Sequence, residues 1–112
     1  MKELNKENLI EFAENIYYDD DNYIKLSRGT LKELDGSCCA IGLLYEEFIG
    51  PITMENYTTD CIVCIENLLS KTGVKGIYHA FFHLLSINEY TNSDCLRAKL
   101  VRDRLIEIAE KM

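Results

Sequence analysis

Four side chains that can ligate zinc recur at a spacing typical of small zinc sites. Cys61 and Cys64 are separated by two residues, and fourteen residues lie between Cys64 and the first histidine of the pair His79 and His83. Histidines four positions apart share one helix face, and zinc accepts sulfur and imidazole ligands. However, both cysteines fall in an amphipathic helical pattern, and the segment lacks the basic residues of a nucleic-acid-reading finger. We expect no cofactor and keep this set as an alternative metal site.

The adjacent pair Cys38 and Cys39 opens another apolar stretch. A helix N-terminus lowers a thiol pKa, so either cysteine could act as a nucleophile with His79 or His83 as its base. The competing interpretation is packing, because cysteine behaves as a small apolar side chain and Gly42 lets another helix approach closely. We expect packing and predict no catalytic residue, with a cysteine-nucleophile enzyme as an alternative.

Acidic side chains gather in the first half of the chain. Residues 1–66 carry 14 acidic and 5 basic side chains for a net −9, residues 67–112 carry 5 and 7 for a net +2, and the total is −7. Such a surface repels the phosphates of duplex nucleic acid and membranes but attracts basic protein grooves. The residues predicted to form it are Glu11, Glu14, Asp19, Asp20, Asp21 and Glu46.

Helices must position these side chains. Apolar residues at helical spacing predict a helix over 6–17 with Asn5 as its cap, and a buried helix over 38–49 with Ser37 as its cap and a stop at Gly50 and Pro51. The acidic run and Asn22, residues 19–22, are predicted as a solvated loop, followed over 23–26 by either a short strand or simply extended chain.

Three more helices are predicted in the second half: about 59–73, about 74–85, and one that begins after Asn92 or Ser93 as its cap. The polar residues 86–93 are predicted as a loop. In the last helix the expected apolar face is Leu96, Leu100, Val101, Leu105, Ile108 and Ala109, opposite Arg97, Arg104, Glu107 and Lys111.

The 112 residues, 47% of them hydrophobic, predict one globular domain over 1–112 of mainly α class, with four to five helices and room for a minor strand pair. No apolar run reaches the roughly 18 to 20 residues of a membrane helix, and the N-terminus lacks the apolar core of a signal peptide. Five cysteines, an odd number, favour reduced thiols. We therefore expect a cytoplasmic protein without membrane association.

The sequence SCCAIGLL at 37–44, preceded by RGTL at 28–31, resembles a group of small, mostly uncharacterised phage and bacterial proteins. These proteins place a glycine-leucine element before a Cys-Cys-x-x-Gly-hydrophobic helix, and often an asparagine-aspartate pair before a last amphipathic helix. The close part of the resemblance lies within residues 28–44. It implies a phage or mobile-element origin and brings no agreed catalytic residues. By position, it implies Arg28, Cys38, Cys39 and Asn88 as candidate site residues.

A phage-type helix and an acidic first half together predict an inhibitor of a host defence system that acts in the host cytoplasm, rather than an enzyme. In one form it binds a protein effector, as anti-CRISPR proteins do. In the other it sequesters a signalling nucleotide, which requires converging basic groups such as Arg28, Lys32, Arg97 and Arg102. The apolar segment 77–85 would serve either a core or a homodimer surface.

Overall fold

The computed structural model describes residues 2–27, 38–52, 66–68, 70–71 and 78–112. Its first helix, α1 (Lys6–Ile16), begins where the sequence predicts. The Asn5 side chain caps it by accepting a hydrogen bond from the Asn8 N–H at 2.8 Å. One face of α1 is buried, and its residues are Leu9, Phe12, Ala13 and Ile16.

A small antiparallel hairpin follows α1 directly, and a two-residue turn joins its strands β1 (Tyr17–Asp19) and β2 (Asn22–Tyr23). Tyr17 pairs with Tyr23, and Asp19 pairs with Asn22. The Asp19 carboxylate accepts from the Asp21 N–H at 2.9 Å and from the Asn22 amide at 3.0 Å, which folds the acidic run into the turn. The minor strand pair is thus present, but its strands lie at 17–19 and 22–23 and not at 23–26.

The buried helix of the phage-type segment is α2 (Ala40–Phe48), and it begins later than predicted. Its cap is Cys39 and not Ser37, which lies outside the described residues; the Cys39 sulfur accepts from the Gly42 N–H at 3.4 Å. At the other end, the N–H groups of Ile49 and Gly50 both donate to the Tyr45 carbonyl, and the helix stops before Pro51 as predicted.

The helix α4 (Tyr78–Tyr90) extends five residues into the region predicted as a loop. The prediction of a loop at 86–90 was wrong because Asn88 is buried and hydrogen-bonded inside the fold, so a polar residue marks an inner face here. Most of the helix predicted over 59–73 lies outside the described residues. Within that range, residues 66–68 and 70–71 are helical, and Leu68 is fully buried.

The last helix, α5 (Asp94–Glu110), is capped by Ser93, whose hydroxyl accepts from the Leu96 N–H at 3.2 Å. Its inner face differs from the predicted one. Arg97, expected on the polar side, is 1% exposed, whereas Leu96 and Leu100 are 46% and 36% exposed. The buried face is thus turned relative to the expected one and consists of Arg97, Ala98, Val101, Leu105, Ile108 and Ala109.

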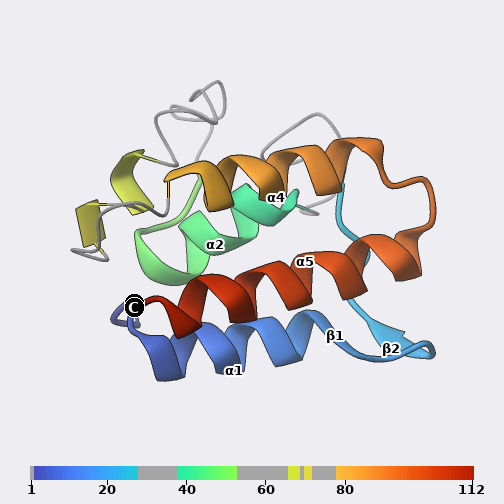
Figure 1. Ribbon diagram of the computed structural model, residues 1–112, viewed down its shortest axis with the longest axis horizontal. Coiled ribbons are helices and arrows are strands. Elements are labelled where there is room, and N and C mark those ends of the chain that lie inside the picture. The colour runs from blue at the N-terminus through green and yellow to red at the C-terminus, as the bar shows by residue number, and fades with distance from the viewer. Residues whose placement is uncertain (1, 28–37, 53–65, 69, 72–77) are drawn as a thin grey trace.

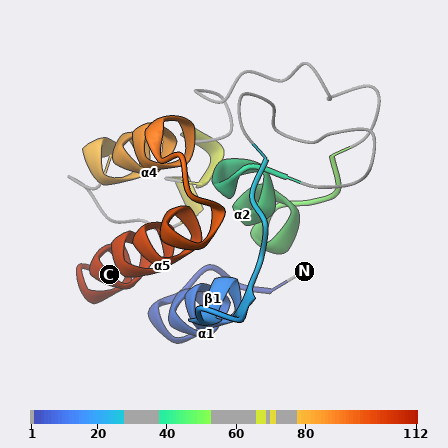
Figure 2. The same ribbon diagram turned by 90° about the vertical axis from the view of Figure 1, so that its right-hand side faces the viewer.

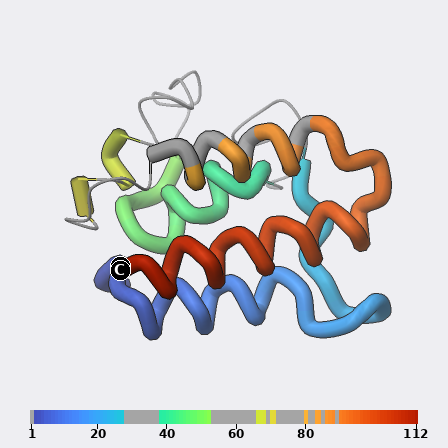
Figure 3. The backbone as a smooth tube through the Cα atoms, in the orientation of Figure 1, coloured from blue at the N-terminus to red at the C-terminus, as the bar shows by residue number. Residues whose placement is uncertain are grey.

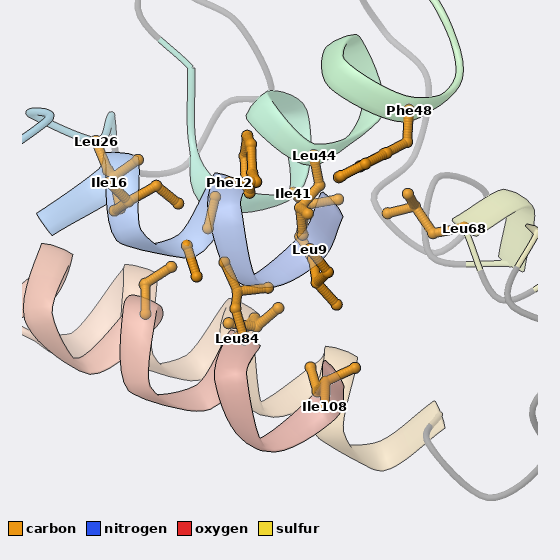
Figure 4. Packing of buried hydrophobic residues seen from close by; sticks show 14 of the residues in the cluster. Leu9, Phe12, Ile16, Leu26, Ile41, Leu44, Phe48, Leu68, Leu84 and Ile108 are labelled. Carbon is orange, nitrogen blue, oxygen red and sulfur yellow. The ribbon is translucent and has the colours of Figure 1, made fainter. Parts of the chain in front are cut away.

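The chain is mainly helical, and its helices pack around one shared core. α1 and α5 run antiparallel side by side, α4 packs on α5, and α2 packs against α4 (Figures 1 and 2). Figure 4 shows side chains from α1, α2, α4 and α5 meeting in this core, including Leu9, Ile41, Leu84 and Ile108. Phe12 and Phe48 contact each other edge to face, with ring centroids 5.6 Å apart.

The β1–β2 hairpin and the connection from α4 to α5 lie at the same end of the molecule (Figures 1 and 3). From β2 the chain passes α5 towards α2 and α4 (Figure 2). Among the described residues, no helix combines the length and apolar character needed to cross a bilayer.

Candidate functional site

Two of the residues implied by the resemblance meet at the start of α2. Asn88, 2% exposed, accepts a hydrogen bond from the Ala40 N–H at 3.0 Å, next to Cys39. Its amide nitrogen donates to the Ser27 carbonyl at 2.7 Å. Asn88 therefore fastens α4 to the N-terminus of α2 and to the segment that follows the hairpin. Arg28, the neighbour of Ser27, lies outside the described residues.

The cysteine pair is buried, each residue being 4% exposed. Cys39 caps α2, and the Cys38 thiol donates to the Glu46 carboxylate at 3.2 Å. The Cys38 carbonyl accepts from the Ser27 N–H at 3.0 Å. These contacts lie at the start of α2, which is buried and hydrogen-bonded to α4 and to the segment after β2. They are the contacts of capping and packing, and they leave a nucleophilic role for either thiol without support.

Of the four predicted zinc ligands, the two histidines lie in the described part of the chain and the two cysteines do not. His79 and His83 both lie on α4, one turn apart as predicted, and the His83 side chain is exposed. Cys61 and Cys64 lie outside the described residues. The described part of the chain contains no group of three or more histidine, cysteine or acidic side chains arranged to hold a metal. Zinc binding stays a prediction, which metal analysis of protein purified without chelator tests.

Two basic residues expected to hold a nucleotide are engaged within the fold. The Arg97 guanidinium donates to the carbonyls of Thr91 at 2.6 and 3.1 Å and Leu26 at 3.2 Å, and to the Asp94 carboxylate at 2.7 Å. Arg102 bonds Asp103 at 2.7 and 3.0 Å. Arg97 thus connects α5 to the segment after β2 through a buried hydrogen bond. Neither arginine presents an unoccupied cation to an anionic ligand.

The predicted acidic residues separate into two kinds by their contacts. Asp19 holds the hairpin turn, and Glu11 lies 3.7 Å from the Lys2 ammonium. Asp20 accepts from the Tyr17 hydroxyl, and the Cys95 thiol of α5 donates to the same oxygen at 3.4 Å. Asp19 and Asp20 thus shape and fasten the hairpin end, and Glu46, the sixth predicted acid, accepts from the Cys38 thiol. Glu14 and Asp21, both exposed, line a hollow instead.

The bond between Tyr17 and Asp20 changes how both groups titrate. It acts with burial to raise the pKa of Tyr17 from 10.0 to about 12. The same bond, followed by the bond from Cys95, lowers the pKa of Asp20. Burial, and then the nearby Asp20, raises the pKa of Cys95. At neutral pH this cluster is therefore a neutral phenol and a neutral thiol around one carboxylate, and it fastens the hairpin to α5.

The hollow beside Glu14 and Asp21 lies between the end of α1 and the hairpin and has a volume of about 660 Å³. Two tyrosines border it, Tyr18 and Tyr23, with exposed fractions of 78% and 38%. We call the outer face of this end the hairpin surface, made of Glu14, Asn15, Tyr18, Asp21, Asn22, Tyr23 and Ile24. Its lining contains two carboxylates, two amides, two phenol rings and one aliphatic side chain, and no basic group.

A second, smaller hollow of about 330 Å³ shares Glu14 and Tyr18 with the first. Here the Arg102 guanidinium lies over the Tyr17 ring, 4.6 Å from its centroid, and bonds Asp103. Tyr17 and Tyr18 are consecutive residues at an irregularity in the pairing of β1 with β2, and both line this hollow. Tyr17 is 7% exposed and its ring is covered by a cation, whereas the neighbouring Tyr18 is 78% exposed.

No family model, curated protein or solved structure matches this chain. The chemistry of the hairpin surface therefore rests on its own geometry. Sequence reasoning identified Glu14 and Asp21 but missed Tyr18 and Tyr23, and it assigned Arg102 to a nucleotide and not to the Tyr17 ring. The signal that could have revealed them is the pair of tyrosines on either side of the acidic run, because a turn of asparagine and aspartate residues brings its flanking residues together.

Proposed function

We propose that this chain is a binding protein whose hairpin surface docks on a basic groove of a partner protein. The observation that carries the proposal is the hollow in which Glu14 and Asp21 stand beside two exposed tyrosines. Tyrosine is enriched in protein interfaces because it offers a large apolar face and a polar tip. Carboxylates beside it would favour a positively charged partner and speed the encounter.

The charge of the surrounding sequence supports a basic partner. Residues 7–24, which include α1 beyond its first residue and the whole hairpin, contain six acidic side chains and no lysine or arginine. A negative potential therefore extends beyond the hollow along the outer side of α1, where Glu7 and Glu11 are also exposed. The same potential opposes the approach of phosphates, so a nucleic acid or a free nucleotide is a poor ligand for this surface.

The resemblance to phage proteins suggests which kind of basic partner this surface would bind. A partner that binds nucleic acid has a basic groove, and a nuclease of a host defence system is such a partner. By occupying the groove, the chain would inhibit the nuclease without chemistry of its own. The alternative form, which sequesters a signalling nucleotide, has weaker support because Arg97 and Arg102 are engaged within the fold.

An infection assay tests the proposal in cells. The chain is expressed in bacterial strains that each carry one defence system with a nucleic-acid-guided nuclease, and phage plaques are counted. We expect plaques to be restored in at least one strain. The double variant Glu14→Gln, Asp21→Asn should lose the effect, whereas the matched control Glu66→Gln, Glu110→Gln, which removes two exposed charges elsewhere, should keep it.

Two results would contradict this function. In the first, expression restores plaques in none of the strains, or both double variants restore them as well as the wild type does. In the second, calorimetry with cyclic oligonucleotides shows tight binding that the Glu14→Gln, Asp21→Asn variant retains, which would favour nucleotide sequestration.

A further inference from the structure

We infer that the hollow of the hairpin surface receives an arginine side chain of the partner. This inference rests on the proposed function, because it names the group of a basic partner that the surface recognises. It goes further in one respect: a negative surface alone would take lysine and arginine equally well, whereas the lining of the hollow distinguishes between them.

The side chains around the hollow match the chemistry of a guanidinium. Tyr18 and Tyr23 offer phenol rings on which a planar cation can stack, and Glu14 and Asp21 offer carboxylates that accept its N–H donors. The side-chain amides of Asn15 and Asn22 add two more acceptor oxygens. A guanidinium has five donors in one plane and stacks on aromatic rings, whereas an ammonium is a compact point charge that keeps its water tightly.

A guanidinium held by a tyrosine ring and a carboxylate is already present in the molecule, at Tyr17, the residue before Tyr18. In the neighbouring hollow, the Arg102 guanidinium lies 4.6 Å from the Tyr17 ring centroid and bonds the Asp103 carboxylate at 2.7 and 3.0 Å. Glu14 and Tyr18 line this hollow too, so the two hollows are adjoining parts of one surface. Tyr17 thus gives an example, within the same chain, of a tyrosine ring and a nearby carboxylate that together hold a guanidinium.

The larger hollow has the same components without a cation from the described part of the chain. Tyr18 is 78% exposed, and among the described residues no arginine or lysine lines this larger hollow. Neither the Glu14 nor the Asp21 carboxylate takes part in a described ion pair or side-chain hydrogen bond. Within the described chain, an aromatic face and two carboxylates therefore remain for a guanidinium from another molecule.

Fluorescence anisotropy with two labelled peptides tests the inference on the full chain. The probes are an arginine-glycine peptide and a lysine-glycine peptide of equal length and charge. We expect the wild type to bind the arginine peptide more tightly. Tyr18→Leu should weaken arginine-peptide binding roughly two- to fivefold, the change expected for one exposed cation–π contact, and leave lysine-peptide binding nearly unchanged. Tyr18→Phe keeps the ring and should keep the preference.

The control is Tyr90→Leu, which removes a tyrosine that is 83% exposed and does not line the hollow; it should bind both peptides as the wild type does. Equal affinity for the two peptides, with no effect of Tyr18→Leu, would overturn the arginine site and leave the acidic docking surface standing. Binding of neither peptide at low salt would overturn both proposals. Circular dichroism of each variant shows whether the fold is retained, and Tyr18→Phe is the least disruptive substitution if Tyr18→Leu fails to fold.

Discussion

The side-chain oxygen of Asn88 accepts a hydrogen bond from the backbone N–H of Ala40 at 3.0 Å, across 48 positions of sequence. The first N–H groups of a helix have no partner within the helix, so a buried helix start needs an acceptor from elsewhere. Asn88 supplies it at the first residue of α2, while its amide nitrogen donates to Ser27. One polar side chain therefore joins three segments of the chain at the centre of the fold.

Replacing Asn88 should destabilise the protein strongly. The variant Asn88→Ala leaves the Ala40 N–H and the Ser27 carbonyl without this partner in a buried place, which should lower the free energy of unfolding by about 2–4 kcal/mol. Urea denaturation followed by circular dichroism measures the change. Asn92→Ala, at an exposed position, is the control and should stay within about 0.5 kcal/mol of the wild type. A similar small effect for Asn88→Ala would contradict the bridging role.

Replacing Arg97 should destabilise the protein as strongly as replacing Asn88, although Arg97 is a charged residue. The variant Arg97→Met keeps much of the side-chain volume but removes the donors to Thr91 and Leu26, at an expected cost of about 2–4 kcal/mol. The matched control Arg104→Met breaks a partly exposed pair with Glu107 and should cost less than about 1 kcal/mol. Thermal or urea unfolding compares the two. Equal effects would show that the burial of Arg97 contributes nothing specific.

The buried positions of Asn88 and Arg97 could not be predicted from the sequence, whereas the starts of α1 and α5 could. The start of α1 and its cap Asn5, the start of α5 and its cap Ser93, and the mainly helical class followed from local pattern, because periodicity and capping are properties of nearby residues. Arg97 and Asn88 were placed on a polar face and in a loop. Arg97 also bonds the nearby Thr91 and Asp94, but the partners that define an inner position, Leu26, Ser27 and Ala40, are 48 to 71 positions away and leave no local signal.

The candidate site was predictable to a similar extent. Charge pattern identified the acidic end of α1 and the turn, but not which carboxylates face outward. Asp19 and Asp20 are occupied by the turn and by Tyr17, and only the three-dimensional hairpin shows that Glu14 and Asp21 border a hollow. The tyrosines were missed because β1 is three residues long, too short to give an alternating pattern.

The raised pKa of Tyr17 predicts a loss of stability at high pH. The folded protein holds the phenol proton to about pH 12, whereas the unfolded chain releases it near pH 10.0, so the contribution is complete below pH 10 and is lost between pH 10 and 12. The lowered pKa of Asp20 acts in the opposite direction, with a contribution present at neutral pH and lost as pH falls through and below the usual carboxylate value of 3.8.

Tyrosinate absorbance measured during a pH titration of the folded protein tests this prediction. The wild type should show a late step near pH 12, and Tyr17→Phe should remove it. Tyr90→Phe, at an exposed tyrosine, should leave the late step in place. If the late step persists in Tyr17→Phe, Tyr17 is not the tyrosine whose pKa is raised, and the account of its bond to Asp20 is contradicted.

The central claim, that the hairpin surface binds a basic partner through Glu14 and Asp21, is tested most directly by one titration. The lysine-glycine peptide is titrated against the wild type, the Glu14→Gln, Asp21→Asn variant and the Glu66→Gln, Glu110→Gln control, at low and at physiological salt. Lysine is used because it reports the carboxylates and not the stacking on tyrosine. All three proteins differ only at exposed positions, and both variants change the net charge equally.

We predict that the wild type and the control bind with the same Kd at low salt and that binding weakens at higher salt, because exposed ion pairs are screened. The Glu14→Gln, Asp21→Asn variant should bind roughly two- to thirtyfold more weakly, the range expected from the loss of two exposed ionic contacts. Equal weakening in both double variants would mean that net charge alone attracts the peptide. That result, or an affinity unchanged in the Glu14→Gln, Asp21→Asn variant, would contradict the claim that this surface is the binding site.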